Sequence, residues 1–381
     1  MSIFVKICTL VTITLLLSLP AYGEEYVFDE NSVFEVYPRE EMDSLYEALP
    51  DGVKDELIGY FSAQGDTERV DSLRDKLDFR YITEFLWKSV TSSLPSWLGT
   101  LGTLLAVVVI SSVVKNTLST SMSEDITSGT VSMITAVAAG GIALKSAEVS
   151  TAYIASLCSV MNAMIPVMSA VMLTGGGVTQ ASVNSAALML YITTVQNITD
   201  KFLVPVAGAL FALSTFSGVF KGVNISAFIA GVQRFLMSVF GFSLMVFSFV
   251  LGIQTSLASS ADSLGMKTVK FAVGSYVPFV GGAVSEALGA VAAGLSHVRR
   301  MAGAVGVVII LVVVLPALIS LFMSRITLVI CKSVAETLEC HEASSPLTDA
   351  EKVVSLFLAF SAMTGVFFIF ATVLFMNSGL H

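Results

Sequence analysis

The stretch AGAVGVVIILVVVLPALISLFM, which runs from Ala302 to Met323, decides the fold class of this protein. It contains no charged side chain and is almost entirely aliphatic between Val305 and Leu315. An α-helix needs about 20 consecutive, mostly apolar residues to cross the hydrocarbon of a bilayer. We therefore predict that this stretch crosses a membrane as a helix. Leu104–Ile110 is a second, nearly uninterrupted apolar run and predicts another crossing.

Apolar stretches of similar length occupy most of the chain around these two. Eight are clear candidates for spans, with Phe271–Ser296 as a ninth possibility: Trp97–Val114, Ile126–Leu144, Thr151–Leu173, Ala181–Ile198, Phe202–Phe220, Phe235–Thr255, Ala302–Met323 and Val353–Met376. Several are rich in Ala, Ser, Thr and Gly, which let helices approach closely in lipid. We predict an all-α, polytopic membrane helix bundle of about eight or nine spans over residues 96–381.

Composition supports this class and separates one segment from the rest. Of the 381 residues, 55% are hydrophobic and 13% charged, against about 45–50% and 25% in soluble domains. The net charge of −9 arises from acidic residues concentrated between Glu24 and Glu84. Such an acidic segment argues against binding to nucleic acid or directly to anionic lipid headgroups.

Residues 1–23 have the pattern of a signal peptide. Lys6 precedes the apolar run Ile7–Leu17, and the small residues Ala21 and Gly23 stand at positions −3 and −1 before Glu24. This arrangement is typical of a signal-peptidase site. An uncleaved signal anchor is the alternative, and either form would export the segment that follows.

Residues 24–95 are predicted to form a small acidic, helical, extracytoplasmic segment. Short stripes of apolar side chains recur at helical spacing, separated by turn residues such as Pro50-Asp51-Gly52. Helices this short cannot build a large core alone and need a partner. The segment is either a solvated helical cap or a docking surface for extracytoplasmic proteins.

The stretch Lys267–Arg300 differs from the other apolar stretches. Gly274, Pro278, Gly281 and Gly282 should interrupt a helix. A broken helix at membrane depth is tolerated where protein or a watery cavity satisfies the freed backbone groups. We therefore predict a functional, pore-lining element here.

Glu286 lies just after this predicted break, inside the apolar zone. A charge there costs about 2.5–3.5 kcal/mol at the bilayer centre, and such residues usually face the interior of a bundle. Glu286 could instead sit near an interface and pair with Lys267, Lys270 or Arg299. The same segment offers a helix-packing face of small side chains at every fourth position: Gly281, Ser285, Gly289 and Ala293.

Patterns that indicate catalysis or cofactor binding are missing from the sequence. The three histidines, His297, His341 and His381, are scattered without partners at ligand spacing, so no metal site is predicted. No phosphate-binding loop, nucleophilic triad or disulfide framework is recognisable. We expect neither enzymatic activity nor a cofactor, and uphill transport would require an ion gradient or a separate ATPase.

The orientation of the spans does not follow from the sequence. When nine spans are assumed, the basic residues of the predicted loops divide nearly evenly between the two sides, which gives no positive-inside bias. If Phe271–Ser296 re-enters the membrane instead of crossing it, the division becomes even.

The run KTVKFAVGSYVPFVGG, residues Lys267–Gly282, resembles the signature stretch of the stage III sporulation protein AE family. Ala302–Gly306 and Leu315–Ala317 are also similar to that family, as is the order of signal, polar exported segment and multispan domain. The resemblance extends from about Trp97 to the C-terminus. It implies a multispan protein of the mother-cell membrane that surrounds the forespore. It also implies a multiprotein channel between the two cells, with a separate ATPase and extracytoplasmic ring-forming subunits as partners.

The preferred hypothesis is a membrane subunit of this sporulation channel, with the Gly274–Glu286 region lining the route. One alternative is a membrane scaffold that anchors the ring-forming proteins through the acidic segment. The other is a self-sufficient secondary transporter, for which matching broken helices in two halves would be expected. The cargo and the oligomeric state, with a homo-oligomer among the alternatives, stay open.

Overall fold

The computed structural model describes residues 47, 79–118, 124–174, 176–217, 225–276 and 281–377. Beyond residue 47 the described chain is helical apart from short turns, which confirms the predicted all-α class for these residues. The elements are α5 (Phe79–Leu118), α6 (Glu124–Thr174), α7 (Val178–Ile198), the π-helix η3 (Thr199–Leu203), α8 (Val204–Ser217), α9 (Ile225–Tyr276), α10 (Gly281–Thr337) and α11 (His341–Asn377).

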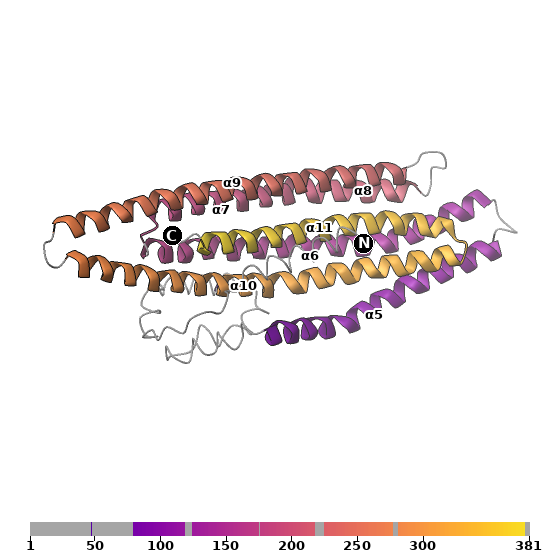
Figure 1. The fold of residues 1–381 in the computed structure, drawn as a ribbon. Helices are drawn as coiled ribbons and strands as arrows, with labels where there is room; N and C mark the ends of the chain where they lie inside the picture. Colours follow the sequence, from indigo (N-terminus) through magenta and orange to yellow (C-terminus); the bar gives the residue numbers. More distant parts are fainter. Residues whose placement is uncertain are drawn as a thin grey trace.

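The helices form a long up-and-down bundle (Figure 1). The α6, α10 and α11 helices lie in the middle, between α5 on one side and α9 with α7 and α8 on the other. At one end of the bundle, called here the α10–α11 end, α5, α8 and α10 finish and α6, α9 and α11 begin. The opposite end is called the α9–α10 end. Because α7, η3 and α8 follow one another without a break, the chain makes six runs along the bundle.

Five helices are long and apolar enough to cross a membrane in the described part of the chain. Their apolar portions are Trp87–Thr117, Ile126–Leu173, Ser226–Gly265, Gly306–Thr337 and His341–Phe375. The helices are longer than a bilayer requires: α10 has 57 residues and is therefore about 86 Å long, against about 40–45 Å for a bilayer with its headgroups. The protein is a multi-pass membrane protein whose helices extend beyond the membrane.

The structure has fewer candidate spans than the predicted eight or nine, because two pairs of predicted spans merge and one merged pair, α7–η3–α8, is not among the five. Ile126–Leu144 and Thr151–Leu173 both belong to α6, which continues through Lys145 and Glu148. These two charged side chains are exposed on the helix surface, while Ser146 between them is buried and donates to the Ile142 carbonyl at 2.8 Å. A polar interruption here marks exposed charged side chains on one continuous helix, not a loop.

The second merged pair, Ala181–Ile198 and Phe202–Phe220, is joined by the π-helical turn η3. The ninth candidate, Phe271–Ser296, is divided between two helices, since α9 ends at Tyr276 and α10 begins at Gly281. It is not a single span.

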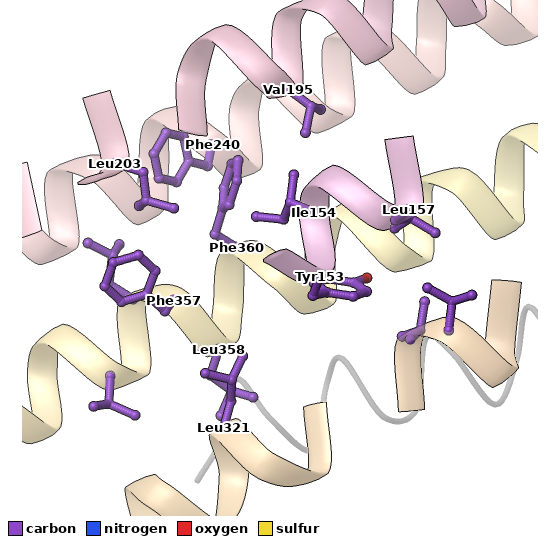
Figure 2. Close-up of a cluster of buried hydrophobic side chains, with 14 of the residues drawn as sticks. Tyr153, Ile154, Leu157, Val195, Leu203, Phe240, Leu321, Phe357, Leu358 and Phe360 are labelled. Carbon is purple, nitrogen blue, oxygen red and sulfur yellow. The ribbon is translucent and has the colours of Figure 1, made fainter. Parts of the chain in front are cut away.

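The core lies where α6, α7, α9, α10 and α11 meet near mid-bundle (Figure 2). Phe357 and Phe368 of α11 are completely buried. The rings of Phe240 and Phe360 lie 4.7 Å apart. Small side chains bring the helices together, and the Ser150 and Ser361 hydroxyl oxygens of α6 and α11 are hydrogen-bonded at 2.7 Å. The predicted packing face of Gly281, Ser285, Gly289 and Ala293 lies outside the part of the chain whose side chains are described, and it stays a prediction.

Two predicted parts lie largely outside the described residues. These are the signal peptide of residues 1–23, with its Ala21 and Gly23 cleavage site, and most of the acidic segment 24–95. The predicted boundary after Pro95 falls inside α5, which begins at Phe79 and continues through that proline.

Candidate functional site

The predicted pore element lies at the α9–α10 end of the bundle. Gly274 is in the last turn of α9, and Gly281 and Gly282 are the first two residues of α10. Pro278 lies outside the described residues. The backbone of four further predicted residues is helical, but their side chains are not described: Ser285, Glu286, Gly289 and Ala293. The element connects two antiparallel helices (Figure 1).

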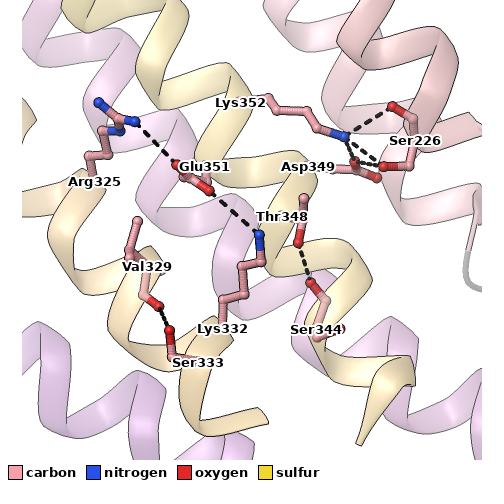
Figure 3. A network of polar contacts seen from close by, with 10 residues as sticks. All are labelled: Ser226, Arg325, Val329, Lys332, Ser333, Ser344, Thr348, Asp349, Glu351 and Lys352. Carbon is pink, nitrogen blue, oxygen red and sulfur yellow. Dashed lines mark hydrogen bonds and ion pairs between the residues drawn. The ribbon is translucent and has the colours of Figure 1, made fainter. Parts of the chain in front are cut away.

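A different set of residues meets inside the bundle toward the α10–α11 end (Figure 3). We call this set the charge cluster. It joins three helices and lies within portions of them that are apolar enough to span a membrane. Its members are Ser226 of α9, Arg325 and Lys332 of α10, and Asp349, Glu351 and Lys352 of α11.

One half of the charge cluster ties the first turn of α9 to α11. Asp349 has no exposed surface. Its Oδ1 accepts hydrogen bonds from Lys352 Nζ at 3.0 Å and from Ser226 Oγ at 2.8 Å. Lys352 Nζ also donates to Ser226 Oγ at 2.6 Å and to the Ser226 carbonyl at 3.0 Å. A buried ion pair is tolerated when hydrogen bonds of this kind satisfy its remaining donors and acceptors.

The other half ties α10 to α11. Glu351 lies 3.4 Å from Arg325 Nη2 through Oε1 and 4.0 Å from Lys332 Nζ through Oε2. Arg325 and Lys332 are seven residues apart, and this spacing places both on the same face of α10. Two cations thus share one carboxylate, and the buried Nε of Arg325 has no hydrogen-bond partner.

A third polar contact closes the α10–α11 end. Lys115 of α5 lies 2.7 Å from Glu342 Oε2 and donates to the Glu339 carbonyl at 3.0 Å. Glu339 has a positive φ of 54° in the turn between α10 and α11. The neighbouring Cys340 is buried, and this burial raises the pKa of its thiol above the ordinary value. Such a thiol is a poor nucleophile at neutral pH.

A fourth polar contact lies near the α9–α10 end, where α7 begins. Gly177, the residue before α7, has no side chain to cap the helix. Asp262 of α9 takes this role, because its two carboxylate oxygens accept from the Thr179 and Gln180 backbone N–H groups at 3.1 and 3.0 Å. A carboxylate is favourable at a helix N-terminus, where N–H groups are unpaired.

The arrangement supports positioning of helices more than covalent chemistry. In the described part of the chain there is no group of three or more His, Cys, Asp and Glu residues that could hold a metal ion. The described cysteines, Cys158, Cys331 and Cys340, are buried. The charge cluster fixes α9, α10 and α11 with respect to one another while keeping charged groups inside the bundle.

The sequence reasoning missed the charge cluster because it placed Arg325 and Lys332 in a loop. The span was assumed to end at Met323, whereas α10 continues to Thr337. The seven-residue spacing of the two bases within a continuing apolar pattern could have revealed a helical face. The pairing with Glu351 could not be foreseen, because it depends on how α11 returns along α10.

Comparison with known proteins gives one match. A family model described as Stage III sporulation protein AE matches residues 67–379, a range that includes every helix described above. No curated protein and no solved structure matches the chain.

Proposed function

The chain belongs to the stage III sporulation protein AE family, and from this we propose that it is a membrane subunit of the transport channel between mother cell and forespore. The family match carries the proposal, because it spans the whole described bundle, and it confirms the resemblance inferred from Lys267–Gly282. Membership implies a role in sporulation. The channel, its ATPase and ring-forming partners and the mother-cell membrane belong to the proposal.

The described helices support a role inside the membrane. Five of them are apolar enough to span it, and α11 packs against α6, α9 and α10 in a continuous core. Charged residues in the interior of a membrane bundle usually mark a functional pathway or a structural pairing. The charge cluster is a structural pairing, since most of its donors and acceptors are paired.

We place the route of the channel at the Gly274–Glu286 region, at the α9–α10 end. The support is the change from α9 to α10 between Tyr276 and Gly281, next to an acidic residue in an apolar context. Glycines at 281 and 282 would let another backbone or a cargo pass close to the helix.

The test replaces Gly281 and Gly282 together by leucine and scores spore yield against the amount of protein in the membrane. We expect spore yield to fall while the protein accumulates normally. Gly141→Leu is the matched control, because Gly141 is exposed and a Cβ added there would meet no atom within 4 Å. Normal sporulation with stable Gly281→Leu/Gly282→Leu protein would contradict this placement of the route.

A deletion of residues 24–78 that keeps residues 1–23 separates the channel from the scaffold. A scaffold would lose its extracytoplasmic partners and keep its membrane insertion, which co-purification and membrane fractionation measure. If the deletion leaves partner recruitment unchanged, the scaffold alternative is wrong. A channel subunit whose route lies in the bundle should then still require an intact Gly274–Glu286 region.

A further inference from the structure

The outer face of α7 and η3 carries polar and charged side chains where a membrane helix normally presents apolar ones. Gln196, Asp200 and Lys201 are exposed, together with Thr193, and Asn197 lies beside them. We call these five residues the polar strip. Met189 and Leu190 on one side of it and Val204 on the other are exposed by 57%, 62% and 40%. The strip therefore interrupts an otherwise apolar outer surface.

The polar strip lies near the middle of its helical run. The run extends from Val178 to Ser217, so Asp200 is about 33 Å from its first residue and about 26 Å from its last. The adjacent Leu203 is completely buried and packs into the central core with Phe240 and Phe357 (Figure 2). The strip is thus at the level of the core and away from both ends of the bundle.

Nothing in the described chain neutralises the two charges of the strip. Asp200 and Lys201 form neither an ion pair nor a hydrogen bond with any described residue. The run α7–η3–α8 is not among the five candidate spans, but it packs beside them, and within a membrane lipid would be a poor cover for these charges, since a charged side chain at the bilayer centre costs about 2.5–3.5 kcal/mol. Both charged residues belong to the π-helical turn η3, and π-turns within α-helices are frequent at functional sites.

The charges of the strip complement a second copy of the same strip. Thr193 and Asn197 are four residues apart and lie on the same side of α7. Asp200 and Lys201 are consecutive and both exposed, so their side chains lie on either side of one outward-facing line. Two copies in one membrane have parallel helices and a two-fold axis along the membrane normal. That axis sets Asp200 of each copy against Lys201 of the other.

We propose that two copies of this chain associate through the polar strip, with reciprocal Asp200–Lys201 ion pairs and amide contacts from Gln196 and Asn197. Polar side chains hold membrane helices together by hydrogen bonds across the interface. The other exposed face of comparable length, on α9, is apolar at Phe228, Phe235, Phe242 and Phe249, and lipid can cover it. The inference does not depend on the proposed channel function.

The test uses the full-length chain with its native cysteines replaced by alanine and a single new cysteine at Thr193, within the strip. In membranes treated with a mild oxidant, we expect a disulfide-linked dimer on a non-reducing gel. Phe242→Cys is the matched control, because Phe242 is 68% exposed on the apolar face of α9. No dimer at position 193, or a dimer only at position 242, would overturn the proposal.

Charge exchange in the T193C background tests the ion pairs themselves. D200K and K201D should each lower the association constant of the dimer about tenfold, equivalent to about 1.4 kcal/mol, because like charges then face each other. The double variant D200K/K201D should restore the dimer, which also shows that the chain still folds. A double variant as weak as the single ones would overturn the pairing.

Labelling with a membrane-impermeant maleimide covers the remaining possibility, in which the strip faces water. Rapid modification of T193C without cross-linking would overturn the second-copy proposal in favour of an aqueous groove. These readouts need no sporulating cells. Failure here is therefore distinguishable from failure of the channel proposal, which is judged by the spore yield of the Gly281→Leu/Gly282→Leu variant.

Discussion

At the scale of single residues, burial decides what a polar side chain can do in this bundle. Asp349 is fully buried, yet it accepts hydrogen bonds from Ser226 and Lys352. Lys115 and Glu342 form a closer ion pair, but both keep more than a quarter of their side-chain surface exposed. Solvent weakens an exposed pair, whereas a buried charge that loses its partner is strongly destabilising.

Asp349→Asn should therefore lower stability far more than Glu342→Gln. We expect a loss of about 3 kcal/mol for Asp349→Asn, because Lys352 would keep its charge without the carboxylate. Glu342→Gln should cost about 0–1 kcal/mol. Thermal unfolding of the purified protein in detergent measures both. Adding Lys352→Met to Asp349→Asn should recover part of the loss, and equal effects of the two single substitutions would contradict this account.

Two neighbouring glycines of α6 give a second contrast at this scale. A Cβ at Gly140 would collide with the ring of Phe211 in α8, whereas one at Gly141 would meet no atom within 4 Å. Gly140→Ala should destabilise by about 1–3 kcal/mol through overpacking. Gly141→Ala should be neutral or stabilise by up to about 1 kcal/mol, since alanine favours a helix. Unfolding temperatures of the two variants that do not differ would refute the close approach of α6 and α8.

At the scale of elements, continuity of helices separates this fold from a chain of short spans. α6 runs for 51 residues through Lys145 and Glu148, and η3 joins α7 to α8. In both places charged side chains leave the helix outward into exposed positions. A polar interruption in an apolar sequence pattern can therefore mean either a loop or a group of exposed polar side chains on a continuing helix.

Ala147→Pro tests whether α6 is continuous. In a helix interior proline removes one hydrogen bond and clashes with the preceding turn, at a cost of about 3 kcal/mol or more. A loop at this position would tolerate it. We expect Ala147→Pro to accumulate poorly and to unfold at a lower temperature. Ala147→Gly should cost only about 1 kcal/mol, and a well-folded Ala147→Pro protein would disprove the single helix.

At the scale of the whole molecule, six runs bring both ends of the described chain to one side. α5 starts and α11 finishes toward the α9–α10 end (Figure 1). Basic residues lie toward both ends, with Lys115 and Lys332 near the α10–α11 end and Lys267 and Lys270 near the other. Because residues 24–78 are expected to be exported, α5 should start outside the cytoplasm, and the α10–α11 end should therefore face the cytoplasm. The loop count made from the sequence included Lys145 and Lys201, although both lie in helices, and leaving them out still divides the remaining basic residues evenly.

Reporter fusions should show this orientation. Alkaline phosphatase, which is active only outside the cytoplasm, should be active when fused after Asn377 and inactive after Leu118. A fluorescent protein that folds only in the cytoplasm should give the opposite pattern. If α7, η3 and α8 did not cross the membrane, five spans would remain and Asn377 would lie on the cytoplasmic side. The fusion after Asn377 thus decides between five and six crossings.

The sequence by itself determined that this protein lies in a membrane, that it is helical and which family it belongs to. An uninterrupted apolar run such as Ala302–Met323 can be stable only in lipid as a helix, because no water is present to satisfy the backbone. That constraint is local, so it can be read from consecutive residues. The family match over residues 67–379 agrees with the resemblance seen in Lys267–Gly282.

Only the tertiary structure decided which polar residues meet. Glu351 pairs with Arg325 because α11 folds back along α10, and Asp262 caps α7 from a helix more than 80 residues later in the chain. Such contacts depend on the order and direction in which helices pack. Apolar periodicity does not encode that order, since in lipid every apolar face is equally well solvated.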